Sequence, residues 1–143
     1  EDHGSVVLRS HYQGLRKAFD GWQYPRDPNT GAIAGDFKAV EEHYRKLSAR
    51  MGFTLNPPEP LVNQVGYQLM GEGKLDEAIA ALKSNVERYP QSANVYDSLA
   101  EAYLLSGETA LAVQNYEKSV ALDPKNSNAI DMLKKLKGKE VDK

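Results

Sequence analysis

Cysteine is absent from the 143-residue chain, which excludes disulfide bonds, thiolate nucleophiles and cysteine-ligated zinc. A strong excess of charge is missing too. The formal net charge is −2, whereas nucleic-acid-binding domains normally carry a basic patch. No apolar run approaches the ~20 residues that cross a bilayer. We therefore expect neither a nucleic-acid partner nor a membrane span.

Motifs for catalysis or metal binding are equally scarce. Of the three histidines, we expect His11 and His43 on the surfaces of amphipathic helices, and no H-E-x-x-H motif occurs. The glycine spacing of a G-x-S-x-G nucleophile elbow occurs only at residues 31–35, where Ile33 occupies the serine position. We therefore predict no metal, no cofactor and no complete catalytic triad within this chain.

The sequence does contain an internal repeat. Two similar passages begin at Glu59 and Ala93, 34 residues apart. Each reads as an apolar-periodic helix, a glycine turn, a second apolar-periodic helix and a proline. The identical pairs at this offset are Gly73/Gly107, Ala78/Ala112, Val86/Val120 and Pro90/Pro124. The pattern predicts antiparallel helix pairs at residues 60–72 with 75–89 and at residues 93–105 with 108–122.

The spacing resembles the tetratricopeptide repeat, whose 34-residue unit follows W-x-x-L-G-x-x-Y, A-x-x-x-F and P. The second unit matches at Tyr96, Leu99, Ala100, Tyr103, Ala112, Tyr116 and Pro124, and the first at Val62, Val65, Gly66, Leu69, Ala78, Leu82 and Pro90. The resemblance implies an all-α superhelix of two repeats. A third start at Ser127, followed by lysines, predicts a capping helix with a polar outer face.

Two further helices are expected upstream of the repeats. Residues 36–51 place apolar side chains on one face and end before Gly52, and residues 6–22 show a second such pattern after Ser5. Residues 24–35 are rich in Pro, Gly, Asn and Asp and read as a loop. We therefore divide the chain into residues 1–24, a loop and linker helix at 25–58, the repeats at 59–126 and a cap at 127–143, about seven helices in all.

The first residues, E-D-H-G-S, place His3 in a loop ahead of a capping serine and an amphipathic helix. With the following V-V-L-R-S-H-Y-Q-G-L-R, this stretch is similar to the end of the catalytic domain in bacterial siderophore-esterase-like enzymes of the α/β-hydrolase class, which often continue into C-terminal tetratricopeptide repeats. The resemblance implies that His3 is the catalytic histidine of a longer parent esterase. It also implies that the chain alone, which lacks the nucleophile and the acid, is not an enzyme.

The repeat pattern predicts a surface for a protein or peptide segment, because the first helix of each pair lines the concave side of stacked repeats. The residues expected there are Asn63, Gln64, Tyr67, Asn94, Asp97, Ser98 and Glu101. A partner could be a segment of the same polypeptide, such as the hydrolase domain. A solvated face that only supports the hydrolase remains an equal alternative.

Two functions stay open at the level of sequence. One is a non-catalytic, positioning domain of an esterase, and the other is a stand-alone adaptor that binds a peptide segment. We expect the apolar stripe of residues 6–19 either to fold back on the repeats or to pair with a second copy of the chain in a homodimer, because exposed stripes of that size drive association. The compartment, whether cytoplasmic, periplasmic or exported, is not indicated.

Overall fold

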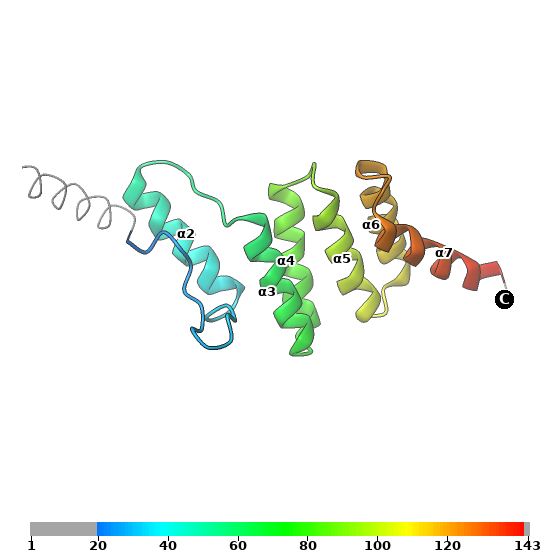
Figure 1. The fold of residues 1–143 in the computed structure, drawn as a ribbon, viewed down its shortest axis with the longest axis horizontal. Helices are drawn as coiled ribbons and strands as arrows, with labels where there is room; N and C mark the ends of the chain where they lie inside the picture. The colour runs from blue at the N-terminus through cyan, green and yellow to red at the C-terminus, as the bar shows by residue number, and fades with distance from the viewer. Residues whose placement is uncertain (1–19, 142–143) are drawn as a thin grey trace, which may run out of the picture.

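The computed structural model describes residues 20–141, and the side chains up to residue 138. In that range the protein is all-helical (Figure 1), without a strand and with one isolated bridge between Arg26 and Ile33. The helices follow one another along an elongated molecule. They are α2 (Phe37–Met51), α3 (Glu59–Gly71), α4 (Leu75–Arg88), α5 (Ala93–Leu105), α6 (Thr109–Leu122) and α7 (Ser127–Val141).

The predicted fold class is confirmed. Helices α3 and α4 form one pair and α5 and α6 a second, within a residue or two of the predicted bounds, and α7 packs on α6 as the start of a third unit. The linker helix α2 begins after Asp36, whose Oδ1 accepts a hydrogen bond from the amide of Ala39 at 2.8 Å, as an N-cap should. The helix predicted before residue 22 falls mainly on residues 1–19, outside the described part.

The turn inside each pair has the same geometry. Gly73 and Gly107 adopt φ values of 74° and 85°, which residues with a side chain rarely adopt. The amide that follows each glycine bonds back into the preceding helix, from Lys74 to the Leu69 carbonyl at 2.9 Å and from Glu108 to the Tyr103 carbonyl at 2.8 Å. This is the Schellman arrangement for ending a helix, and it recurs with the 34-residue period.

A buried polar contact also recurs, although its residues differ between the two units. Asn85 Nδ2 donates to the Glu59 carbonyl at 3.1 Å, and Ser119 Oγ donates to the Ala93 carbonyl at 2.9 Å. Both donors lie on the second helix of a pair, and both carbonyls belong to the first residue of the first helix. These contacts therefore fix how the two helices of each pair meet.

Two apolar clusters make up the core. The first joins α2 to one side of the α3–α4 pair, and the second joins the other side of α4 to α5, α6 and α7. Within the first pair, an ideal Cβ on Gly66 would lie 2.7 Å from both Cγ and Cδ2 of Leu82, a fully buried side chain. Helices α3 and α4 can pack this closely only because residue 66 lacks a side chain.

The segment before the repeats is part of the same core. Val40, Tyr44 and Leu47 of α2 and Ile33 of the preceding loop are buried in the cluster that includes Leu61. An ion pair between Arg88 and Glu41 adds to this packing. Arg88 Nη2 of α4 donates to Glu41 Oε2 of α2 at 2.8 Å, and Nη1 lies 2.8 Å from Oε1. The loop before α2 and α2 itself therefore pack against the first repeat.

None of the described helices combines the length and the apolar character that a bilayer crossing requires.

Candidate functional site

Helices α3, α5 and α7, the first helices of successive units, share a polar face that hydrogen bonds connect from one helix to the next. Asn94 Nδ2 of α5 donates to Glu59 Oε1 of α3 at 3.0 Å. One repeat later, Asn128 Nδ2 of α7 donates to Asp97 Oδ2 at 2.9 Å and to Glu101 Oε1 at 3.1 Å. We call this surface the α3–α5–α7 face, and the residues predicted from the repeat pattern lie on α3 and α5.

Part of this predicted set holds the helices together. Asn63 and Ser98 are only 8% and 1% exposed. Asn63 Nδ2 donates to Ser98 Oγ at 3.0 Å, and Asn85 Nδ2 of α4 donates to Asn63 Oδ1 at 3.2 Å. These side chains join α3, α4 and α5 through a buried polar network. They set the spacing of the helices that carry the exposed residues.

The remaining members of the predicted set reach solvent to different degrees. Gln64 and Asn94 are exposed, Asp97 and Glu101 are half-buried, and Tyr67 is 43% exposed. The Tyr67 hydroxyl donates to Ser98 Oγ at 3.3 Å, and Gln64 Oε1 accepts from Arg26 Nη1 at 2.6 Å. The face therefore presents one aromatic ring among amides and carboxylates.

The electrostatics of the face are dominated by the two carboxylates of α5. Burial of its hydroxyl, and then the negative charges of Glu101 and Asp97, raise the pKa of Tyr67 to about 12. Burial followed by the same two charges also raises the pKa of Tyr116. Asp97 and Glu101 lie one helical turn apart, and neither takes part in an ion pair with a described residue. The local field is negative.

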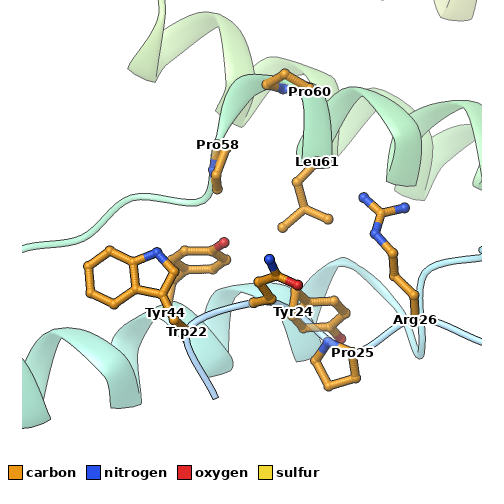
Figure 2. A pocket seen from close by; sticks show the side chains of 9 residues that line it. Trp22, Tyr24, Pro25, Arg26, Tyr44, Pro58, Pro60 and Leu61 are labelled. Carbon is orange, nitrogen blue, oxygen red and sulfur yellow. The ribbon is translucent and has the colours of Figure 1, made fainter. Parts of the chain in front are cut away.

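A separate cavity of about 730 Å³ lies where the loop before α2 meets the start of α3 (Figure 2). Its lining is aromatic and proline-rich, with one cationic side chain at its edge. The residues are Trp22, Gln23, Tyr24, Pro25, Arg26, Tyr44, Pro58, Pro60 and Leu61. Nothing in the repeat pattern indicated this cavity, since it forms between the loop and the first repeat.

The remaining sequence predictions concern metal ligands and the three histidines. Residues 20–138 contain no group of three His, Asp or Glu side chains that could hold a metal ion. His3 and His11 lie outside the described residues. The prediction that His43 is a surface residue is wrong. Its ring is half-buried against Tyr24 and Tyr44, with centroid distances of 5.1 and 5.2 Å, and its Nε2 is enclosed.

Sequence reasoning missed three polar side chains in this region, namely Asn128 on the face itself and the buried side chains of Asn85 on α4 and Tyr116 on α6. The 34-residue offset contained the signal for one of them, because Asn128 occupies the repeat position of Asn94. Tyr116 was predicted as a packing residue only, yet its hydroxyl has no hydrogen-bond partner among the described residues. Asn85 was hidden because the equivalent residue in the next unit is Ser119.

Comparison with known proteins identifies the second helix pair. Residues 93–126 match the model of the tetratricopeptide repeat family. Cellulose synthase operon protein C of Escherichia coli K12 is 36% identical over 63 residues, which is 44% of this chain and 5% of that protein. The corresponding protein of E. coli O157:H7 has the same identity over the same length, 6% of its chain. The chain therefore spans only about one-twentieth of these relatives. On this evidence, the chain contains a tetratricopeptide repeat.

Proposed function

We propose that this chain is a protein-interaction module whose α3–α5–α7 face binds an extended segment of a partner protein. Tetratricopeptide repeats stack helix pairs into extended binding surfaces. The observation that carries the proposal is the arrangement of the α5 side chains. The half-buried carboxylates of Asp97 and Glu101 lie near the exposed ring of Tyr67 on α3. The described cation–ring contacts involve other rings, since Lys83 of α4 lies over Tyr103 and Lys118 of α6 lies over Tyr96.

The experiment selects linear peptides from a random displayed library on the immobilised chain. Selected peptides are then tested on two variants of the face, Tyr67→Ala and Asn94→Ala. Gln114→Ala, an exposed position on α6, serves as the matched control. We expect the face variants to weaken binding about tenfold or more, because exposed aromatic anchors carry much of the energy of an interface. The control should bind as the parent chain does.

Peptides that bind equally to all three variants would place the binding surface elsewhere. Failure to select any peptide in repeated rounds would contradict the proposal as well. In that case the repeats act only as a support, since their polar network already holds α3, α4 and α5 in place without a partner.

The finer proposal, that the module belongs to an esterase and positions its catalytic domain, rests on the sequence resemblance, above all that of residues 1–16. The relatives reported above are not esterases by name, so this part of the prediction has no support beyond the resemblance. The test measures ester hydrolysis by a parent protein that includes sequence upstream of Glu1. There, His3→Ala should lower ester turnover by orders of magnitude, because a triad histidine acts as general base and then general acid. The chain by itself should show only background hydrolysis.

A stand-alone adaptor differs from this in the source of the segment bound. In an adaptor the segment comes from another protein, whereas in the esterase it comes from the catalytic domain of the same polypeptide. The predicted homodimer through residues 6–19 is a third proposal. Light scattering on the full chain and on a chain starting at Asp20 would test it, and equal, monomeric masses would exclude it.

A further inference from the structure

A cluster of hydrogen-bond acceptors lies on the α5 and α7 part of the α3–α5–α7 face, next to α6. It consists of Asp97, Glu101 and Tyr116, with Tyr67 and Asn128 beside them. The described part of the chain supplies this cluster with neutral donors only. Asn128 Nδ2 bridges one oxygen of each carboxylate, and Tyr67 donates to the neighbouring Ser98.

Two atoms of the cluster are buried without a hydrogen bond to any described residue, namely Asp97 Oδ1 and the hydroxyl of Tyr116. Tyr116 is 0% exposed, so its hydroxyl is enclosed by protein. Its pKa is raised by burial and then by Glu101, Asp97 and Tyr67, which places the hydroxyl in the field of both carboxylates. A buried polar atom without a partner destabilises the folded chain. Here two such atoms lie beside carboxylates that form no ion pair with a described residue.

The chemistry of the cluster selects its ligand. An ammonium group has three N–H donors and a compact charge, whereas a guanidinium presents a planar fork that suits one carboxylate. The cluster offers three separate acceptors, Asp97 Oδ1, the Tyr116 hydroxyl oxygen and the Glu101 carboxylate, beside the exposed ring of Tyr67. A cation near such a ring gains a further electrostatic attraction.

We propose that this cluster binds the side-chain ammonium of a lysine in the partner segment. The inference rests on the proposed function, since it names the chemistry of the segment that the α3–α5–α7 face binds. Asn128 and Tyr67 are both exposed, and exposed side chains change rotamer on the picosecond-to-nanosecond timescale. Entry of the ammonium requires a local change of rotamer, because both atoms that lack a partner are buried.

The experiment uses the full chain and three synthetic pentapeptides, Gly-Gly-Lys-Gly-Gly with blocked ends, the same peptide with Nε-acetyllysine, and the same peptide with arginine. Amide chemical shifts of the protein are recorded during titration. We expect the lysine peptide to shift amides of α5 and α7 and to bind about tenfold tighter than the acetyllysine peptide, a difference that corresponds to about 1.4 kcal/mol. The arginine peptide should fall between them.

Three variants and a charge-matched control then separate ligand binding from structure. Asp97→Asn and Glu101→Gln should each weaken binding of the lysine peptide severalfold. Glu87→Gln, an equal change of charge at an exposed position on α4, should not change it. Tyr116→Phe keeps the ring and removes only the hydroxyl. It should raise the melting temperature of the free chain, because the unpartnered group is gone, and it should weaken the lysine peptide.

The outcomes are distinct. Equal affinity for the lysine and acetyllysine peptides, or unchanged affinity in Tyr116→Phe and Asp97→Asn, would overturn the ammonium site. If the displayed library nevertheless yields peptides that depend on Tyr67 and lack lysine, the binding face stands and the ammonium site is wrong. If neither the library nor the pentapeptides bind, both proposals fail together.

Discussion

The close approach of α3 to α4 at Gly66 provides a quantitative test of how this fold is held together. Gly66 of α3 faces Leu82 of α4, and a Cβ at residue 66 would lie 2.7 Å from Leu82 Cγ and 3.1 Å from Cδ1. Real Cβ contacts are not that short, so Gly66→Ala must move α3, α4 or the buried Leu82 side chain. Overpacking of this kind costs about 1–3 kcal/mol.

An opposing effect favours the same substitution. Gly66 lies in a helix, where alanine is better than glycine by ~0.8–1.0 kcal/mol. The clash exceeds this gain, because Leu82 is fully buried and Cγ is not the flexible end of its side chain. We expect Gly66→Ala to lower the free energy of unfolding by about 1 kcal/mol, measured by urea denaturation followed by circular dichroism.

The decisive measurement is a double-mutant cycle with Leu82→Ala. That substitution alone should cost about 2–5 kcal/mol, since it leaves a cavity. In its background the clash is absent, so adding Gly66→Ala should stabilise the chain by up to ~1 kcal/mol. Gly71→Ala is the control, because nothing lies within 4 Å of its added Cβ. An equal effect of Gly66→Ala in both backgrounds would refute the argument that this contact sets the distance between α3 and α4.

Three further predictions follow from the described contacts. Asn85→Ala should lower the free energy of unfolding by about 1–3 kcal/mol, measured by urea denaturation, because it leaves the Glu59 carbonyl and Asn63 without their hydrogen-bond donor. Asn85→Ser should lower it less, since Ser119 makes the equivalent contact in the second unit. Equal losses in the two variants would refute the idea that this contact has the same role in both units. Arg88→Met should cost about 1 kcal/mol through loss of the paired contact with Glu41, and no loss in thermal melts would show that packing alone holds α2. Stability should fall as pH rises from about 10 to 12, because Tyr67 stays protonated in the folded chain while unfolded tyrosines ionise; Tyr67→Phe should flatten this fall in alkaline melts, and an unchanged slope would contradict it.

The helices were predictable because their signals are local and repeated. Gly73 and Gly107 mark the turns, Pro90 and Pro124 follow the second helices, and the 34-residue offset aligns them. The pattern that makes a helix amphipathic is independent of the identity of its neighbours. The prediction of two pairs, with their bounds, is therefore confirmed to within a residue or two.

The contacts between helices were less predictable. Asn85 and Ser119 donate to equivalent carbonyls, yet they share neither size nor functional group, so aligning the repeats does not pair them. The sequence predicts His43 on the surface of an amphipathic helix, whereas the ring of Tyr24, from the loop before α2, packs against its imidazole. Such contacts depend on segments that are distant in sequence, and no periodicity encodes them.

Helix α5 leaves its two carboxylates without an ion pair to any described residue. A helix selected for stability alone would pair Asp97 and Glu101 with lysines one turn away, as α2 pairs Glu42 with Arg45 and Lys46. Instead, α5 places these carboxylates beside a buried tyrosine hydroxyl and an asparagine, and both the hydroxyl and Asp97 Oδ1 lack a partner among the described residues. Local sequence preferences agree with the structure through most of this fold, and proteins tend to depart from such preferences at functional sites. The departure at α5 is therefore better explained by a ligand than by folding.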